Sequence, residues 1–522
     1  MKPPKLLSVL LLLLFLVANP LQAQLSSEQI DQLAQKALKE FNVAGISIAV
    51  VKDGKIIHEK GYGVQSATTK LAVDENTNFQ IASNSKAFTT AALAILIDEG
   101  KLKWSDKVRT YLPEFKMYND YVTENFTVED LLCHRSGLGL GAGDLMDFPD
   151  GADFTIQDKL TFFQHFKPES GFRTKFDYDN QLYIIAGELV KRISGISWEK
   201  FVQTRILNKL EMNHSYASLE MAKDKGNFAV PHSVEFGAIK TMPHFRDMIN
   251  GAAGGMVSNV HDMSLWMLTQ LNKGKYGTNL SQKLFTEARQ REMWKLATVM
   301  DAFNEPRYNM HFNGYGLGWF INDVRGNLLV SHTGGLPGML TSVDMIPDLN
   351  LGVVVLTNTE NSGSYAFSAI KRTIIDSYLK LEDNNWIEKY NKRYQANKSA
   401  GDAETTKVWK TVEANKKVKI NTSDYIGIYE DKWFGKMEVF MKGNQLWIKS
   451  HRSPKLNGSM QFYKANTFAI KWEYQDMNCD AFALFALDEE GKAQSIKMKG
   501  ISPEIDFSFD FQDLDLQRIK NK

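Results

Sequence analysis

Cysteine is nearly absent from this 522-residue chain, which contains only Cys133 and Cys479. Two cysteines cannot form a disulfide framework, and we expect both to be small buried side chains in different domains. Neither a Cys-x-x-Cys nor a His-Glu-x-x-His pattern occurs, so the sequence predicts no zinc site. No metal ion and no cofactor are expected.

An excess of charge of either sign is also missing. The formal net charge is +1 and the pI is about 7.7, which gives no bulk attraction to nucleic acid or to an anionic membrane. Beyond the N-terminus, no stretch is apolar enough to span a bilayer. We therefore expect no nucleic acid partner and no membrane span after removal of a signal. The oligomeric state stays open.

The N-terminus has the pattern of a secretory signal peptide. Lys2 and Lys5 precede an apolar stretch over residues 6–18, and residues 21–23 (Leu-Gln-Ala) fit a cleavage site. The alternative is an uncleaved membrane anchor. The preferred interpretation is a signal peptide over residues 1–23 and a periplasmic or secreted mature protein.

Two halves of one sheet are predicted on either side of a helical region. Short turns between the predicted strands indicate an antiparallel sheet, and the residues between the halves are mostly helical with long loops, so the fold class is α+β. After a helix over 27–41, the predicted strands are 46–51, 55–61, 316–322, 328–333, 341–346 and 352–357, followed by a helix over 365–379.

A smaller all-β domain is predicted at the C-terminal end. Residues 383–422 are polar with little apolar periodicity, which indicates a linker with some helix. Six or more short strands follow, and residues 506–511 alternate polar side chains with phenylalanine as a further strand would. The predicted organisation is a first domain over 24–382, the linker, and a small barrel or sandwich over 423–522.

Four Ser-x-x-Lys pairs occur in the chain, and their context distinguishes one of them. Ser83 and Lys86 open a stretch, residues 86–98, that is apolar on nearly every side and ends at Gly100. A helix without a polar face is a buried helix. Ser83 is therefore expected at the start of a central helix, with Lys86 one turn later on the same face.

The residue types around Ser83 suit acyl transfer. A serine hydroxyl becomes a nucleophile when a base removes its proton, and burial lowers the pKa of a lysine toward that role. Tyr178 is a second candidate base or a proton shuttle, and Asn180 can hold Lys86 and a substrate carbonyl while Asp179 faces away. The division of the base role between Lys86 and Tyr178 stays open because coupled groups titrate together.

Five segments together resemble the serine β-lactamase and penicillin-binding-protein superfamily, in particular the class C β-lactamase-related hydrolases of the D-aminopeptidase and esterase type. They follow the family's order: 79–86, 132–138, 178–183, 254–258 and 332–335. The resemblance implies a β-lactamase/transpeptidase-like fold and cleavage of amide or ester bonds through a Ser83 acyl-enzyme. More weakly, the C-terminal part resembles small β domains appended to some of these hydrolases.

The last of these segments, His332-Thr333-Gly334-Gly335, departs from the Lys-Thr-Gly of typical β-lactamases. The resemblance implies an edge strand against which substrate lies, with the N–H groups of Ser83 and Gly335 as the oxyanion hole. The family's lysine helps to bind a substrate carboxylate, and a histidine is a weaker anchor whose charge depends on pH. We therefore expect a peptidase, amidase or esterase that acts on a small peptide, amide or ester substrate, rather than an efficient β-lactamase.

Alternative functions remain open at this point. A catalytically idle, penicillin-binding-like sensor or scaffold is one, although the complete set of nucleophile, base and amide argues against it. A carboxylesterase or a weak β-lactamase is another. His134 and Arg135 are expected to pin a loop through hydrogen bonds, and Phe176 is expected to pack in the core.

Overall fold

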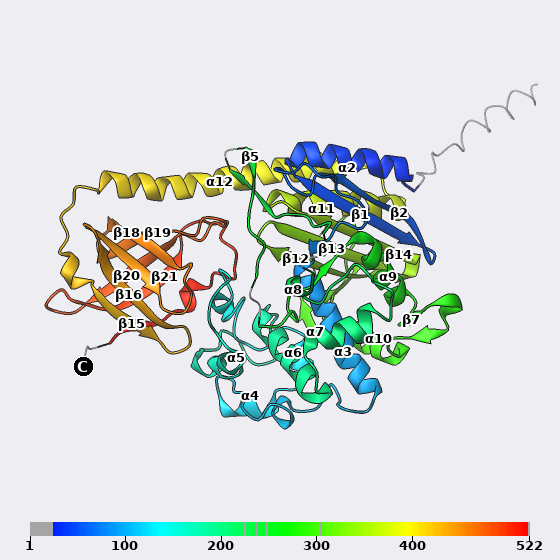
Figure 1. Cartoon of the computed structure of the whole chain (residues 1–522), viewed down its shortest axis with the longest axis horizontal. Coiled ribbons are helices and arrows are strands. Elements are labelled where there is room, and N and C mark those ends of the chain that lie inside the picture. Colours follow the sequence, from blue (N-terminus) through cyan, green and yellow to red (C-terminus); the bar gives the residue numbers. More distant parts are fainter. Residues whose placement is uncertain (1–23, 223–225, 236, 247–248, 303–304, 520–522) are drawn as a thin grey trace, which may run out of the picture.

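The computed structural model describes residues 24–222, 226–235, 237–246, 249–302 and 305–519. The predicted signal peptide lies outside the described residues. Along the described chain, a region built on one large sheet is followed by a long helix and a C-terminal barrel (Figure 1).

The large sheet has eight antiparallel strands in the order β2-β1-β14-β13-β12-β11-β10-β9. The predicted N-terminal hairpin thus pairs with β14, far along the chain, as expected. Its turn residues Asp53 and Gly54 have φ of +50° and +77°, which a tight two-residue hairpin requires. The strands are β1 (Gly45–Lys52), β2 (Lys55–Gly63), β9 (Thr298–Met300), β10 (Asn313–Tyr315), β11 (Phe320–Val324), β12 (Asn327–Leu336), β13 (Met339–Ile346) and β14 (Leu351–Thr357).

Helices cover both faces of this sheet, and β1 shows why. Ile46 and Ile48 point into the core that α2 and α11 cover, whereas Ala49 and Val51 point into the opposite core with α3 and α9. The α+β fold class is confirmed. The helices are α2 (Ser27–Phe41), α3 (Ser85–Asp98), α4 (Asp120–Asn125), α5 (Ile156–Thr161), α6 (Asn180–Ser194), α7 (Trp198–Val202), α8 (Leu219–Ala222), α9 (Val260–Leu271), α10 (Glu287–Met293) and α11 (Ser362–Tyr378).

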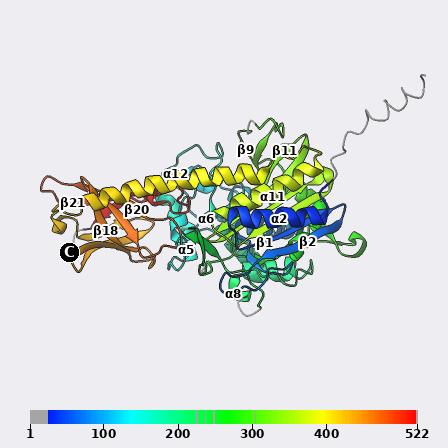
Figure 2. The same ribbon diagram turned by 90° about the horizontal axis from the view of Figure 1, so that it is seen from above.

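The polar segment predicted as a linker with some helix is largely one helix, α12 (Trp386–Ala414), of 29 residues. Its N-terminal half packs on α2 and α11, and its C-terminal half packs on strands of the barrel. Figures 1 and 2 show it crossing from one part of the molecule to the other. Only a few of its side chains are buried, which explains why the sequence shows so little apolar periodicity.

The C-terminal strands close into an eight-stranded barrel, in which β15 pairs with β22. The prediction of a small β domain is confirmed, but the interpretation of residues 506–511 as a strand is wrong. These residues form a loop and a short 3₁₀ turn before the last strand. The strands are β15 (Gly427–Asp431), β16 (Gly435–Lys442), β17 (Gln445–Ser450), β18 (Asn457–Lys464), β19 (Thr467–Trp472), β20 (Ala481–Leu487), β21 (Ala493–Gly500) and β22 (Leu516–Arg518).

Candidate active site

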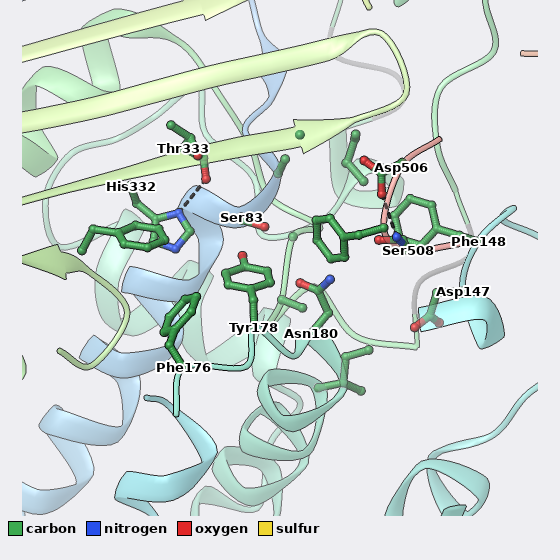
Figure 3. A pocket seen from close by; sticks show the side chains of 18 residues that line it. Ser83, Asp147, Phe148, Phe176, Tyr178, Asn180, His332, Thr333, Asp506 and Ser508 are labelled. Atoms are coloured by element: carbon green, nitrogen blue, oxygen red, sulfur yellow. Dashed lines mark hydrogen bonds between the residues drawn. The ribbon is translucent and has the colours of Figure 1, made fainter. Parts of the chain in front are cut away.

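Ser83 lies in a 3₁₀ turn, Ala82–Asn84, that leads directly into α3. Ala82 has φ of +49°, a conformation that L-residues rarely adopt, so the backbone turns sharply beside the serine. The helix itself is the buried one that the sequence predicts, with Ser85 to Leu96 all buried. This turn projects the Ser83 side chain into a cleft between α3, α6 and β12 (Figure 3).

Lys86 is fully buried one helical turn after Ser83. Its Nζ lies 3.0 Å from Ser83 Oγ, 2.7 Å from Asn180 Oδ1 and 2.8 Å from the Ala253 carbonyl oxygen. All three partners are uncharged oxygens. Burial lowers the pKa of Lys86 to about 7, against an opposing influence of the carboxylates of Asp144 and Asp179. A large fraction of this amine is therefore neutral near pH 7.

Tyr178 lies just before α6, and its hydroxyl points toward Ser83 (Figure 3). Burial raises the pKa of Tyr178 well above its ordinary value, the carboxylates of Asp144 and Asp506 raise it further, and a hydrogen bond with Ser83 only partly opposes them. The Lys86 Nζ is 4.9 Å from the centroid of the phenol ring. The tyrosine is therefore a neutral phenol. Of the two candidate bases, Lys86 is the one whose lone pair is more available to accept the proton of Ser83.

Asn180 is the first residue of α6, and its amide has two fixed ends. Oδ1 accepts from Lys86, and Nδ2 donates to Asp144 Oδ2 at 2.7 Å. Asp179 caps the helix instead, because its Oδ1 accepts from the backbone N–H of Leu182 at 3.2 Å. The two neighbours thus point to different places, as the sequence predicts.

The segment from His332 to Gly335 belongs to β12, which is an interior strand of the sheet rather than an edge strand. The neighbouring strand β11 pairs only with residues 327–331 of β12. Beyond Ser331, β12 continues along the cleft, where Thr333 and Gly335 line its wall. The expected strand edge beside Ser83 is present, although it arises where a shorter neighbour ends.

Gly334 is required by close packing. A Cβ at this position would lie 2.3 Å from the carbonyl oxygen of Ile81 and 2.5 Å from Thr341 Oγ1. At Gly335 the nearest atom to a Cβ is a Leu340 methyl carbon at 3.4 Å. The absence of a side chain at Gly334 therefore lets β12 pack directly against the turn that carries Ser83. Its absence at Gly335 leaves space on the cleft side.

His332 is buried and makes hydrogen bonds through both ring nitrogens. Nδ1 lies 2.6 Å from its neighbour's carbonyl oxygen at Thr333, and Nε2 lies 2.9 Å from the Tyr315 hydroxyl. Burial lowers the pKa of His332 to about 3, and nearby Lys86 lowers it further. The imidazole therefore stays neutral, and the pH-dependent charge anticipated from the sequence does not arise near pH 7.

The cleft around these groups has a volume of about 290 Å³ and a mostly apolar wall. Phe148, Phe176 and Phe320 contribute aromatic rings, so Phe176 lines the cleft, which was the alternative to the core packing expected for it. Asp147 and Asp506 add carboxylates. A small substrate with an apolar group fits such a space better than an extended polymer.

Three residues of this wall come from the barrel: Asp506, Phe507 and Ser508. Figure 3 shows Asp506 and Ser508 on a separate segment facing Ser83 across the cleft. The Phe507 ring meets that of Tyr178 edge to face, with centroids 5.9 Å apart. Sequence reasoning missed these residues, because their polar–aromatic alternation has the period of a strand.

His134 and Arg135 contact the segments that position the site residues. His134 Nδ1 accepts from the backbone N–H of Asp179 at 3.1 Å, and its ring packs against that of Tyr178 with centroids 4.2 Å apart and an angle of 34° between the planes. Arg135 Nε donates to Asp130 Oδ1 at 2.8 Å. Both contacts fit the predicted structural role of the pair, and the first also fixes the position of Tyr178.

No group of three or more His, Cys, Asp or Glu side chains that could hold a metal is found among the described residues. Cys133 and Cys479 are both buried and unpaired. In the described part of the chain, no helix is long and apolar enough to cross a membrane.

The antiparallel sheet, the buried serine–lysine pair at the start of α3 and the glycine-containing β12 together define the serine β-lactamase and penicillin-binding-protein superfamily. The Beta-lactamase family model matches residues 30–375, and the chain belongs to this family. A second match, a domain of unknown function (DUF3471), covers residues 413–518.

Two curated proteins are similar to this chain. "Unguisins hydrolase ungD'" of Aspergillus campestris is 28% identical over 391 residues, covering 70% of this chain and 69% of that protein. "Protein flp" of Staphylococcus aureus (strain NCTC 8325 / PS 47) is 27% identical over 349 residues, 64% of this chain and 63% of that protein. These relatives support a serine-hydrolase kind of function.

Solved structures agree on the fold. An octameric penicillin-binding protein homologue from Pyrococcus abyssi is similar with a TM-score of 0.60 and 20% identity, covering 94% of this chain and 100% of that one. A penicillin-binding protein from Bacillus halodurans is similar with a TM-score of 0.54 and 21% identity, covering 65% of this chain and 98% of that one.

Proposed function

We propose that this protein is an exported serine hydrolase that cleaves small amides or esters through an acyl-enzyme on Ser83. The observation that carries the proposal is the Lys86 Nζ, fully buried, 3.0 Å from Ser83 Oγ and bonded only to uncharged oxygens. A buried lysine without a carboxylate partner is held near neutrality, as a general base must be.

The hydrogen bonds of Lys86 define the first step. In the neutral amine, two N–H bonds donate to Asn180 Oδ1 and the Ala253 carbonyl, which leaves the lone pair directed at the Ser83 hydroxyl. Lys86 takes the serine proton as the serine oxygen bonds to the substrate carbonyl carbon. The carbonyl oxygen becomes an oxyanion facing the N–H groups of Ser83 and Gly335, and each such donor is typically worth about 10²–10³ in rate.

Tyr178 suits the transfer of that proton to the leaving group. Its neutral phenol lies beside Ser83 and near Lys86. It can give its proton to the departing nitrogen or oxygen while it receives the one held by Lys86. Water then attacks the ester of Ser83 by the reverse route, which releases the acid and restores the serine hydroxyl.

The cleft favours substrates without a carboxylate near β12. His332 is neutral, and the described residues that line the cavity include no lysine or arginine. Of the two lining carboxyl groups, Asp147 is paired with Lys159 at 2.8 Å and burial raises the pKa of Asp506. An anionic substrate would therefore find no positive side chain along this wall. We therefore propose peptidase, amidase or esterase activity on small neutral or cationic substrates, with nitrocefin a poor substrate.

A labelling experiment tests the proposal. The full chain is incubated with a fluorophosphonate probe and assayed on p-nitrophenyl acetate, D-amino-acid amides and nitrocefin, beside Ser83→Ala. We expect labelling and turnover in the wild type and neither in the variant. Equal labelling of both proteins would show that another residue is the nucleophile, and absent turnover on every substrate would favour the idle sensor or scaffold.

Export rests on the sequence of residues 1–23, with its two lysines, apolar stretch and cleavage site. Expression of the full chain with a C-terminal tag tests it by fractionation and N-terminal sequencing. A mature protein beginning at Gln24 in the periplasm or medium is expected. Retention in the cell with Met1 or Lys2 at the N-terminus would contradict export.

A further inference from the structure

Asp144 is a fully buried carboxylate that no sequence motif singled out. It lies in a 3₁₀ turn (Asp144–Met146) at the end of the glycine-rich loop over residues 137–144. Uncharged donors reach it: Asn180 Nδ2 at 2.7 Å, Gln181 Nε2 at 3.2 Å and Ser508 Oγ at 3.0 Å. Burial removes the hydration of a carboxylate and is therefore unfavourable, which raises the question of what Asp144 does at this position.

Asp144 determines the orientation of the Asn180 side-chain amide, which has an acceptor at Oδ1 and a donor at Nδ2. Burial raises the pKa of Asp144 to about 7, and on the alkaline side of this value the carboxylate only accepts hydrogen bonds. Ionised Asp144 therefore directs Nδ2 of Asn180 toward itself and Oδ1 toward Lys86. If the amide were flipped, its NH₂ group would donate to the lone pair of neutral Lys86. That lone pair would then be lost to Ser83, and the base would be disabled.

The barrel holds Asp144 in place. The Asp510 carboxylate accepts from the backbone N–H of Gly143 at 2.8 Å and of Leu145 at 2.7 Å, on either side of Asp144. Gly143 has φ of +84°, and a Cβ there would lie 2.2 Å from the Phe162 ring. The backbone conformation at Gly143 therefore allows the end of the glycine-rich loop to form hydrogen bonds with Asp510 of the barrel.

We propose that Asp144 is a positioning residue for the Asn180 amide, and that Ser508 and Asp510 of the barrel complete this arrangement. The inference rests on the proposed serine-hydrolase function and deepens it. It makes the C-terminal domain a part of the machinery that prepares Lys86, in addition to a wall of the cleft.

The test compares Asp144→Asn, Ser508→Ala, their combination and the control Ser502→Ala in the full chain. Ser502 lies in the same barrel segment, and its side chain contacts the backbone N–H of Glu504. The readouts are the rate of Ser83 labelling by a fluorophosphonate, kcat and KM on p-nitrophenyl acetate, and the melting temperature.

We expect Asp144→Asn to slow labelling and kcat by about 10- to 100-fold with KM within about twofold, because one charge-assisted hydrogen bond orients the amide. Ser508→Ala should lose about three- to tenfold. The double variant should match Asp144→Asn, since both changes break one network. Ser502→Ala should behave as wild type.

The pH profile provides a second readout. Titratable and charged groups face Asp144 from every side: Lys86, Asp147, Tyr178, Asp179 and Asp510, with Lys159 held by Asp147 and Gln181. The negative charge of Asp144 raises the pKa of Lys86. Asp144→Asn should therefore move the acid limb of kcat/KM to lower pH, whereas Ser508→Ala, which keeps the carboxylate, should leave the limb in place.

Wild-type labelling rates in folded Asp144→Asn or in folded Ser508→Ala would overturn the inference, as would a loss confined to KM. If Asp144→Asn does not fold, Ser508→Ala decides alone, because it removes one hydroxyl only. Absence of Ser83 labelling in the wild type would instead refute the proposed function, so the two failures are distinguishable.

Discussion

The two walls of the cleft differ in how the chain builds them. The wall with Ser83, Lys86 and Asn180 is built on two largely buried helices, α3 and α6, and the hydrogen bonds of Lys86 link Ser83 to Asn180. The wall with Phe507 and Ser508 is a loop that reaches across from the barrel. The proposed acyl transfer requires particular residue types on the first wall. The loop of the second wall can vary in sequence and thereby change the size and polarity of the cleft.

Removal of the base on the helical wall should have the largest effect. Lys86→Met deletes the proton acceptor for Ser83, and we expect acylation to fall by about 10²–10⁴. Burst kinetics with p-nitrophenyl acetate measure this. Lys371→Met is the control, since it alters another Ser-x-x-Lys pair whose lysine contacts Asp344 at 2.9 Å. A similar loss in both variants would contradict the assignment.

The pH dependence should report the titration of Lys86 together with that of its buried neighbour Asp144. Lys86 must be neutral to act, and burial places its pKa at about 7. Activity should therefore fall about tenfold per pH unit below that value and level off above it. Because Asp144 also has a pKa raised to about 7 by burial, the limb belongs to the coupled pair. A flat profile of kcat/KM from pH 5 to 9 would exclude Lys86 as the base.

Gly334→Ala should test the junction between β12 and the Ser83 turn. Its methyl group would clash with the Ile81 carbonyl oxygen, so the strand must shift, at a cost of about 1–3 kcal/mol in stability. Lower melting temperature and activity are expected. Gly335→Ala is the matched comparison, for which the space on the cleft side predicts a melting temperature close to wild type.

Phe507→Ala should have the smallest effect, and it should change substrate preference rather than the rate of acylation. Loss of the ring enlarges the cleft, so we expect a few-fold higher KM for acetyl esters and a relative gain for longer acyl chains. Leu484→Ala on the exposed barrel surface, where the side chain is 51% exposed, is the control. An unchanged preference for acyl length would show that the barrel loop does not limit substrate size.

The residues around Ser83 could be proposed from the sequence because each group of them is local. Ser83 and Lys86 are three residues apart on one helix, Tyr178 and Asn180 are two apart, and the β12 residues are consecutive. The paired strands β1 and β14 were also predictable, since each strand is apolar and bounded by turn residues.

The barrel wall could not be predicted, because its contacts join residues more than 360 positions apart. Residues 506–511 have the alternation of a strand, yet Asp510 bonds to backbone N–H groups of the other domain. The nearest signal was the density of aspartate among phenylalanines, which is unusual for a strand interior. The polar helix α12 was underestimated for a similar reason, since its few buried residues contact distant partners.

The length of α12 carries a consequence of its own. A helix of 29 residues fixes both the separation and the rotation of the parts attached to its ends. One inserted residue would turn the barrel by about 100° and advance it by about 1.5 Å. The opening above the nucleophile therefore depends on the number of residues in a helix that contributes none of the described residues lining the cleft.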